Sequence, residues 1–262
     1  MTADGGDIPE QPVEIGITGV TGQMGHTVAE TAAKRDDVTA VFGIAPDADA
    51  DRAFPVYSPE ETDVVLAEHA PDAVVDFTVP DATTDLARSC AASGVALVVG
   101  TTGFEEDELS ALEEASSTTP VLKAANFSRG IQALCRALEP ALAALPGYDV
   151  EVLETHHNRK RDAPSGTAKT ILSTIADHRE FESVAGREGI QPREECEVGM
   201  LVRRAGDVRG EHEVMLADND EVLTLTHRAE DRAVFAAGAL DSAVWLADRE
   251  TGWYSFADVV GE

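Results

Sequence analysis

Residues 13–34 read VEIGITGVTGQMGHTVAETAAK and determine the expected fold of the first half of the chain. An apolar run, Val13–Thr18, leads into glycines with the spacing GxxGxxG, and an amphipathic stretch follows from Gln23. Strand, glycine-rich turn and helix in this order are the context of a dinucleotide-binding site, because glycines let the backbone approach a pyrophosphate at the helix N-terminus. A glycine-rich turn without a ligand is the alternative, since the more specific spacing is GxGxxG.

Short apolar segments and longer amphipathic segments continue to alternate up to residue 127. This alternation is typical of parallel strands joined by helices. The expected strands are Val13–Thr18, Val38–Ile44, Ala73–Thr78, Val95–Gly100 and Val121–Ala125, and the expected helices are Gln23–Lys34, Pro80–Ala92, Glu105–Ser116 and Arg129–Ala144. The strands are rich in valine and lack strict polar alternation, as expected when both faces of a sheet are covered. The sequence therefore predicts an α/β protein with a doubly wound, Rossmann-like nucleotide-binding domain.

The chain beyond residue 147 has a different pattern. Its expected strands alternate polar and apolar residues, and they are Tyr148–Thr155, Val198–Arg204, Glu211–Ala217 and Glu221–His227. One expected helix, Gly166–His178, interrupts them, and a last helix is expected from about Arg232 to Asp248. We predict a smaller α+β domain with a mixed sheet. The first residues, 1–11, are acidic and contain glycine, and we expect them to be disordered.

The charge balance excludes whole classes of partner. The 262 residues contain 49 acids and 20 lysines and arginines, a formal net charge of −29 at pH 7. Such a surface repels nucleic acid and anionic membranes, and no apolar run approaches the roughly 20 residues of a membrane helix. We attribute the charge to adaptation to high salt, where screening shortens the reach of repulsion. Three widely spaced cysteines fit buried thiols in a reducing cytoplasm.

Small and hydroxyl-bearing residues close several of the expected strands. They are Asp76-Phe77-Thr78, Gly100-Thr101-Thr102-Gly103 and Ala124-Ala125-Asn126-Phe127. In an open parallel sheet, ligands bind beyond the carboxyl ends of the strands, and small side chains there leave room for a nicotinamide ring. Ordinary turn and cap chemistry explains any one of these motifs, but their recurrence favours binding.

The end of the second expected strand leaves the choice of cofactor open. An NAD site usually places an acid about 20 residues after the glycines, where it binds the ribose hydroxyls. Gly43 and Ile44 carry neither an acid nor an arginine, and we interpret Asp47 as part of a surface turn. The sequence therefore predicts NADH or NADPH as cofactor without choosing between them.

The run His156-His157-Asn158-Arg159-Lys160-Arg161 is the strongest local anomaly of this acidic chain. Such a patch suits a small carboxylate substrate, because a histidine donates protons near neutral pH and a lysine can hold a carboxylate. The helix that opens at Ser165-Gly166-Thr167 offers amides for a second carboxylate. A solvated basic loop is the alternative. We expect no metal, since adjacent histidines on a strand point to opposite faces and no Cys or HExxH motif is near.

Other polar and aromatic residues carry less weight. The isolated histidines are assigned to helix surfaces or sheet positions, and they are His26, His69, His178, His212 and His227. A salt-bridged hairpin is expected where Arg203, Arg204 and Arg209 flank the turn Ala205-Gly206-Asp207. Packing against the last helix and the tail is expected for Trp245, Trp253 and Tyr254.

The chain resembles the dihydrodipicolinate reductase (4-hydroxy-tetrahydrodipicolinate reductase) family of the lysine pathway. The matching segments follow the order of the family and are Gly19–Gly25, Asp76-Phe77-Thr78 with Pro80, Gly100–Phe104, Ala125–Ser128, Glu154 with His156-His157, Lys160, Asp162–Thr167 and Arg204–Asp207. The motif Ala163-Pro164-Ser165-Gly166-Thr167 behind the paired histidines is highly specific.

The resemblance implies roles for the matched residues. The implied pyrophosphate residues are Gly19, Val20, Thr21, Gly22, Gln23 and Met24, and those around the nicotinamide are Gly100, Thr101, Thr102, Ala124, Ala125, Asn126 and Phe127. Hydride from NADH or NADPH and a proton would reduce a carbon–carbon double bond of a small dicarboxylate. The implied catalytic residues are His156, the proton donor, and Lys160. The implied carboxylate-binding residues are His157, Lys160, Gly166 and Thr167.

The resemblance also implies a domain division and an assembly. Residues 12–127 and 233–262 would form the dinucleotide-binding domain, to which the last helix returns. Residues 128–232 would form the domain for substrate binding and oligomerisation, with four chains associating through its sheets. Many family members carry an acid followed by a base where this chain has Gly43 and Ile44, so the adenosine contact differs here.

Two rival functions stand beside this one. Another two-domain nicotinamide enzyme, of the aspartate or inositol dehydrogenase type, lacks the His-His-Asn-Arg-Lys block ahead of Ala-Pro-Ser-Gly-Thr. A non-enzymatic sensor of NAD(P)H has no need of a proton donor beside groups that bind carboxylates. The block at residues 156–167 therefore favours the reductase.

Overall fold

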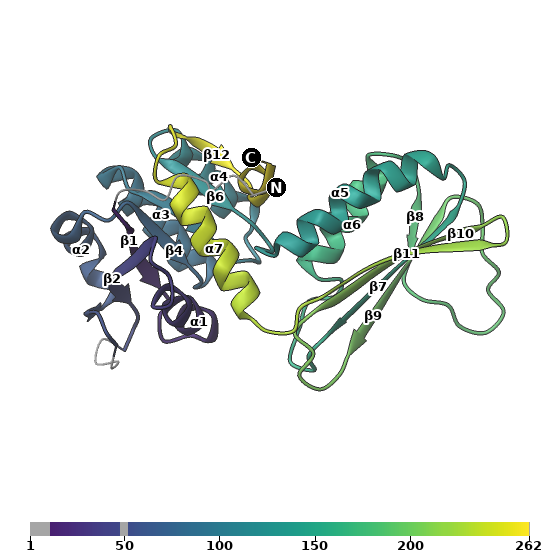
Figure 1. Ribbon diagram of the computed structural model, residues 1–262, viewed down its shortest axis with the longest axis horizontal. Helices are drawn as coiled ribbons and strands as arrows, with labels where there is room; N and C mark the ends of the chain where they lie inside the picture. The colour runs from purple at the N-terminus through teal and green to yellow at the C-terminus, as the bar shows by residue number, and fades with distance from the viewer. Residues whose placement is uncertain (1–10, 48–51, 262) are drawn as a thin grey trace, which may run out of the picture. The chain divides into compact units, whose positions relative to one another are not determined.

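The computed structural model describes residues 11–47 and 52–261, and these form two compact units (Figure 1). Unit 1 comprises Met1–Phe127 and Ala233–Glu262, and unit 2 comprises Ser128–Arg232. Of the lead-in expected to be disordered, all but Gln11 lies outside the described residues. None of the helices described is long and apolar enough to cross a membrane.

Unit 1 is built on a seven-stranded parallel sheet with the order β12-β6-β5-β4-β1-β2-β3. The strands are β1 Val13–Thr18, β2 Val38–Ile44, β3 Val56–Tyr57, β4 Ala73–Asp76, β5 Ala96–Val99, β6 Pro120–Lys123 and β12 Gly252–Tyr254. The helices are α1 Gln23–Ala32, η1 Pro59–Glu61, α2 Thr62–His69, α3 Pro80–Ser93, α4 Glu106–Ser116, α7 Ala233–Leu246 and α8 Phe256–Gly261. The strand order reverses at β1, which pairs with both β2 and β4.

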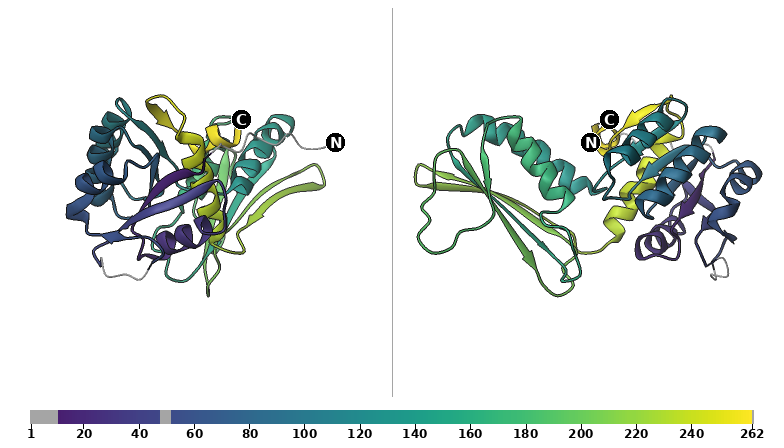
Figure 2. Two further views of the ribbon diagram at one scale, coloured as in Figure 1. Left: turned by 60° about the vertical axis from the view of Figure 1, so that its left-hand side comes forward. Right: turned by 180° about the vertical axis from the view of Figure 1, so that it is seen from behind.

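Two apolar cores lie on opposite faces of this sheet, because successive strand residues point to opposite sides. Val75 of β4 packs into the core beneath α1, α7 and α8, and its neighbour Val74 packs into the core beneath α2, α3 and α4. Helices cover both faces in the views of Figure 2. The predicted doubly wound α/β architecture is therefore confirmed.

The glycine turn depends on a close backbone contact inside unit 1. A Cβ atom added at Gly25, in the first turn of α1, would lie 2.2 Å from the carbonyl oxygen of Gly19. Gly22, the N-cap of α1, is less crowded, since its added Cβ would lie 3.1 Å from the same oxygen. Helix α1 can therefore approach the turn only because residue 25 has no side chain.

Gly25→Ala is expected to destabilise the protein, although alanine alone favours a helix over glycine by roughly 1 kcal/mol. The clash with the Gly19 carbonyl should cost roughly 1–3 kcal/mol, as overpacking usually does. Urea unfolding at fixed KCl measures the change, and Gly22→Ala is the matched control with the smaller expected loss. An increase in stability for Gly25→Ala would contradict the packing argument.

Unit 2 contains a five-stranded mixed sheet with the order β11-β10-β7-β9-β8. Its strands are β7 Asp149–His156, β8 Glu182–Val184, β9 Glu197–Arg204, β10 Glu211–Asp218 and β11 Glu221–Arg228, and its helices are α5 Arg129–Ala144 and α6 Gly166–Ala176. Strand β10 is antiparallel to β7 and β11, and β9 is parallel to β7 and β8. The two helices pack on one face of the sheet and form one apolar core with it.

Several short elements of the structure were not predicted. They are β3, η1, α2, β8, β12 and α8. Two or three residues give no readable period, and in α2 the apolar residues Val64, Val65 and Leu66 are adjacent rather than spaced around one helix face. The tail packs as expected through Tyr254, whose ring centroid lies 5.3 Å from that of Trp245. Trp253 is 42% exposed, so the packing expected for it is wrong.

Candidate active site

A buried carboxylate in unit 1 joins the carboxyl ends of three strands. Asp76 at the end of β4 is fully buried and accepts hydrogen bonds from four threonine hydroxyls. Thr18 of β1 donates at 2.5 Å and Thr101 after β5 at 2.7 Å. Thr78 donates at 2.7 Å and Thr83 of α3 at 2.6 Å. Because a buried carboxylate is costly without partners, these bonds stabilise the strand ends and the first turn of α3 as one group.

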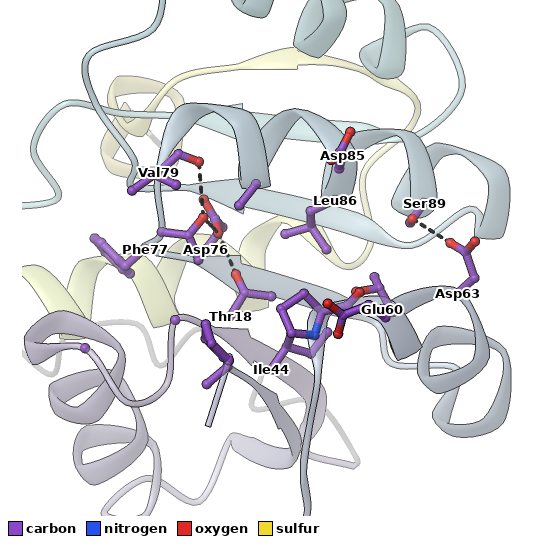
Figure 3. A pocket seen from close by; sticks show the side chains of 18 residues that line it. Thr18, Ile44, Glu60, Asp63, Asp76, Phe77, Val79, Asp85, Leu86 and Ser89 are labelled. Carbon is purple, nitrogen blue, oxygen red and sulfur yellow. Dashed lines mark hydrogen bonds between the residues drawn. The ribbon is translucent and has the colours of Figure 1, made fainter. Parts of the chain in front are cut away.

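A cavity of about 550 Å³ opens beyond the carboxyl ends of β1, β2 and β4 (Figure 3). Gly19 and Gly22 line it, and Gly19 has a left-handed backbone with φ +69°. In an open α/β sheet a nucleotide binds where the strand order reverses, next to a helix N-terminus. The position, the volume and the two glycines where the turn lines the cavity fit the adenosine and pyrophosphate parts of a dinucleotide.

The structure separates the predicted cofactor residues into two groups. Gly19 and Gly22 line the cavity, whereas the predicted nicotinamide residues follow β5 and β6 and do not line it. Val20 and Phe127 are buried in the core and Thr101 is bonded to Asp76, so these residues can offer a cofactor only their backbone. The predicted residues at half-buried or exposed positions are Thr21, Gln23, Met24, Gly100, Thr102, Ala124, Ala125 and Asn126.

The η1–α2 segment contributes cavity residues that sequence reasoning missed. Pro59, Glu60 and Asp63 line the cavity, and Asp63 accepts a hydrogen bond from Ser89 of α3 at 2.5 Å. The sequence carried a signal for this segment. Ser58 begins a capping box with Glu61, and Pro59 stands at the first helical position, which together mark a helix start.

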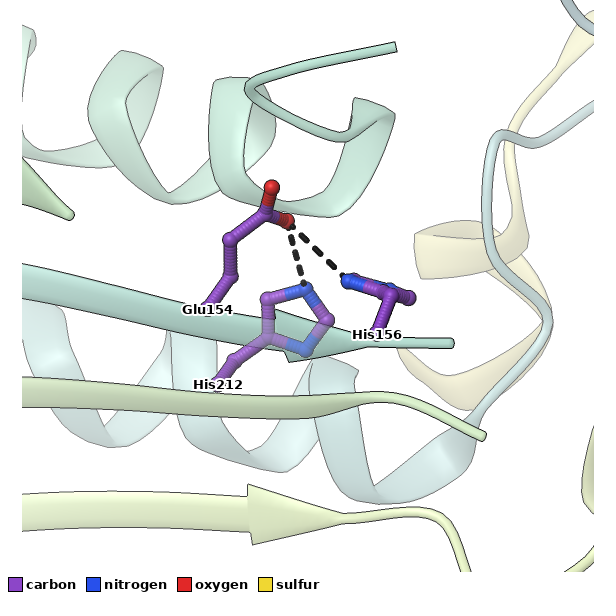
Figure 4. Close-up of side chains that lie close together, drawn as sticks. All are labelled: Glu154, His156 and His212. Carbon is purple, nitrogen blue, oxygen red and sulfur yellow. Dashed lines mark ion pairs between the residues drawn. The ribbon is translucent and has the colours of Figure 1, made fainter. Parts of the chain in front are cut away.

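Unit 2 brings three titratable side chains together near the end of β7 (Figure 4). Glu154 is fully buried, and His156 and His212 are 9% and 1% exposed. The Oε2 atom of Glu154 lies 3.4 Å from Nδ1 of His156 and 3.7 Å from Nε2 of His212. Alternate residues of β7 share a face, and His212 of β10 pairs directly opposite Glu154. His212, assigned from the sequence to an isolated position, is therefore part of this cluster.

The other oxygen of Glu154, Oε1, is held by two donors. Arg204 Nη2 donates to it at 2.8 Å, and the backbone N–H of Ser165 donates at 3.1 Å. Burial acts to raise the pKa of Glu154, but these donors hold that pKa below its ordinary value. The expected salt-bridged hairpin is wrong, because β9 and β10 on either side of this turn both pair with β7 and not with each other. Arg204 contacts buried Glu154 instead, and Asp207 forms an ion pair with Arg159 at 2.8 Å.

The two buried histidines are neutral at pH 7. Burial lowers the pKa of His156 to about 4, with Glu154 acting to raise that pKa and Lys160 acting to lower it. Burial also lowers the pKa of His212 to about 4. An imidazole must gain a proton before it can serve as a general acid, and a negatively charged ligand beside it favours that gain.

Lys160 lies close enough to His156 for its charge to affect the histidine pKa. Its Nζ atom pairs with Asp162 at 2.8 Å, and its side chain is 22% exposed. A substrate carboxylate bound here would replace Asp162 as the negatively charged partner of Lys160. The structure therefore places the predicted residues Lys160 and His156 near each other.

The remaining predicted substrate residues have different surroundings. Gly166 and Thr167 form the first turn of α6, directly after the N-cap Ser165. His157 follows the end of β7, where burial and then the charges of Arg159 and Arg232 lower its pKa. Ser165 thus connects the start of α6 to the histidine cluster, because its backbone N–H donates to Glu154. His157 instead lies near the charges of Arg159 and Arg232.

The cluster in unit 2 also has a donor set that suits a metal ion. Glu154, His156 and His212 each offer one ligand atom, and these three atoms all lie within 4.8 Å of one another. Among the residues described, this is the group of acids and histidines close enough together to hold a metal ion. This set differs from the adjacent His156-His157 pair considered from the sequence. The guanidinium of Arg204, 2.8 Å from Glu154, places a positive charge next to it and disfavours a cation.

The sequence matches two family models over nearly all of its length. "Dihydrodipicolinate reductase, N-terminus" matches residues 13–127, and "Dihydrodipicolinate reductase, C-terminus" matches residues 130–260. The 4-hydroxy-tetrahydrodipicolinate reductase of Haloarcula marismortui is 56% identical, and the match covers 94% of this chain and 98% of that protein. The enzyme of the same name from Natronomonas pharaonis is 54% identical over 95% of this chain and 99% of that protein.

A solved structure shares the fold. Dipicolinate-bound dihydrodipicolinate reductase from Paenisporosarcina sp. TG-14 superposes with a TM-score of 0.75, at 21% identity, and covers 93% of this chain and 97% of that chain. A myo-inositol dehydrogenase from Corynebacterium glutamicum superposes with a TM-score of 0.61 at 14% identity, covering 95% and 92%. The fold is therefore shared by enzymes with different names, and the sequence relatives distinguish among them.

Proposed function

The chain belongs to the dihydrodipicolinate reductase family, and from this membership we propose its reaction. It is a cytoplasmic NAD(P)H-dependent oxidoreductase that reduces 4-hydroxy-tetrahydrodipicolinate, through dihydrodipicolinate, to tetrahydrodipicolinate in lysine and diaminopimelate biosynthesis. The structural observation that carries the proposal is the buried cluster of His156, Glu154 and His212 beside Lys160. A proton source next to a cation that can bind carboxylates suits reduction of a dicarboxylate.

We assign the roles in the reaction to residues of both units. Bound NAD(P)H supplies a hydride. Gly19 and Gly22 leave the backbone open to its pyrophosphate at the N-terminus of α1. Lys160 and His157 bind the substrate carboxylates, together with the first turn of α6. These carboxylates place negative charge beside neutral His156, so substrate binding favours protonation of that imidazole. The proton then completes reduction of the double bond.

One assay tests the reaction. Oxidation of NADH and NADPH is followed with freshly generated 4-hydroxy-tetrahydrodipicolinate in high KCl. Oxidation that requires this substrate is the expected result. No oxidation of either cofactor would reject the assignment, and the rival readings, another dehydrogenase or a non-enzymatic sensor, would then be tested with other substrates.

We propose that NADH is the preferred cofactor, with the adenosine half in the cavity of unit 1. The cavity is lined by three acids, Glu60, Asp63 and Asp85, in addition to buried Asp76, and by no lysine or arginine among the residues described. A 2′-phosphate adds negative charge and would be repelled there. The expected ratio of kcat/KM for NADH over NADPH is about 10 or more, and Glu60→Lys should lower that ratio about tenfold.

The control for this preference is Glu114→Lys, which makes the same charge change on the exposed surface of α4. It should leave the cofactor ratio unchanged. Arg52 donates to the Val20 carbonyl at 3.1 Å and therefore lies next to the glycine turn. A preference for NADPH that disappears in Arg52→Ala would contradict the proposal.

We also propose that the protein functions as a homotetramer at high salt. Helices α5 and α6 cover one face of the sheet in unit 2, while Leu201 of β9 and Val222 of β11 alternate with the residues of that core and are exposed. Salt screens the repulsion that a net charge of −29 per chain would impose on assembly. Light scattering and denaturant unfolding across KCl concentrations should show a tetramer whose stability rises with salt. A monomer, or equal stability at low and molar KCl, would contradict this.

A further inference from the structure

We propose that Glu154 is the positioning residue of the proton donor. Its carboxylate directs Nδ1 of His156 inward, leaves Nε2 to carry the donated proton, and stabilises the charged form of the ring. This inference rests on the proposed function, because it assigns a role in the proton transfer of that reaction. Glu154 does not need to touch the substrate for this role.

The two carboxylate oxygens of Glu154 have different partners. Oε1 is occupied by Arg204 and by the backbone of Ser165, whereas Oε2 has no hydrogen-bond partner and faces Nδ1 of His156 at 3.4 Å. That distance is slightly longer than an ordinary hydrogen bond. Catalytic hydrogen bonds often tighten only when substrate is bound. A small rotation of the His156 ring would therefore complete the bond.

The opposite edge of the His156 ring is open for a different reason. A Cβ atom added at Gly210 would lie 3.3 Å from Nε2 of His156 and 3.5 Å from its Cδ2 atom. Because Gly210 has no side chain, no Cβ atom crowds Nε2. The ring thus has a carboxylate on its Nδ1 side and a glycine beside its Nε2 edge, and a carboxylate on Nδ1 is the orientation that a carboxylate–imidazole donor requires.

The charges around His156 show why this carboxylate matters. Lys160 from the loop and Arg204 from β9 disfavour the imidazolium, and neutral His212 from β10 packs against the ring with its centroid 5.1 Å away. Asp162 favours the imidazolium but pairs with Lys160. Of the two acids that favour the charged ring, Glu154 has the larger effect, and Arg204 helps keep its carboxylate ionised.

The test compares Glu154→Gln with Glu154→Asp. Glutamine removes the charge, and kcat should fall roughly 100-fold while the KM for substrate stays within about threefold, as expected when a proton donor is mispositioned. Loss of the carboxylate lowers the pKa of His156, so the alkaline decline of kcat should move to lower pH. Glu154→Asp should recover part of kcat and shift the decline back. Glu211→Gln on β10, outside the cluster, is the matched control with parental kinetics.

A second measurement is made on the parent protein and does not depend on the folding of a Glu154 variant. Nitrogen-15 NMR of the imidazole rings in the parent, with His156 assigned by its loss in His156→Gln, reports which ring nitrogen carries the proton. We expect the Nδ1–H tautomer. An Nε2–H tautomer in the parent, or parental kcat and pH profile in Glu154→Gln, would overturn the proposal. Stoichiometric zinc in the purified protein, with activity lost on chelation, would overturn it in favour of a metal site. An inactive parent would instead reject the proposed function.

Discussion

His156→Gln is expected to lower kcat by about 10²–10⁴-fold, the usual contribution of a positioned general acid. Glutamine is polar and can occupy the buried position, where the histidine is 9% exposed, but its amide cannot deliver a proton. The groups proposed to bind the carboxylates, Lys160, His157 and the start of α6, remain in place. Substrate affinity should therefore change little, and the loss should appear in kcat rather than in KM.

Steady-state kinetics and a binding titration together measure this effect. A non-reacting dicarboxylate analogue of the proposed substrate is a suitable probe of carboxylate binding. The variant should bind it with nearly parental affinity. If kcat in His156→Gln stays within a few-fold of the parent, the donor is another group, and His212 becomes the next candidate because it shares the Glu154 oxygen.

Lys160→Ala is expected to reduce both substrate affinity and turnover. A hydrogen bond to a charged group contributes about 1.5–3 kcal/mol, so the KM for substrate should rise roughly 10- to 150-fold. Removal of the lysine also leaves Asp162 without its ion-pair partner, and the aspartate would then repel an incoming carboxylate. The fall in kcat/KM should therefore exceed the fall in kcat alone.

Two variants separate binding by Lys160 from a general loss of charge. Arg159→Ala removes a neighbouring base whose exposed ion pair with Asp207 should contribute little, so parental kinetics are expected. Asp162→Asn removes the competitor for Lys160 and should keep or improve substrate affinity. Parental behaviour of Lys160→Ala would show that the basic run is a solvated loop.

The sequence predicted the regular elements because their signals are local. The strands Val13–Thr18 and Val38–Ile44 and the helix Arg129–Ala144 have the expected bounds. Val-rich runs and amphipathic periods depend only on near neighbours, so a single chain reveals them. The segment Pro59–His69 was missed although its capping box was present, because its apolar residues have no helical spacing. Glu60 and Asp63, two of the acids that line the cavity, lie in this segment and were therefore missed as well.

Only part of the candidate site could be predicted from the sequence. The basic run and the start of α6 are contiguous, so His156, Lys160 and Gly166 stood out in an acidic chain. His212 stood alone in the sequence. The antiparallel register of β10 against β7 places it opposite Glu154, 58 residues away along the chain. A local sequence pattern does not predict which residue of a distant strand will pair with a given residue.

The sequence by itself determined the two-part fold, the glycine turn at Gly19–Gly25 and the location of the basic run. Tertiary structure alone decided that Arg204 would contact buried Glu154, and that Gly210 would lie beside Nε2 of His156, where a side chain would crowd the ring. The physical reason is that periodicity and turn chemistry are properties of neighbouring residues. Burial, charge pairing and strand register arise only when distant segments pack together, and these settle which side chains share one environment.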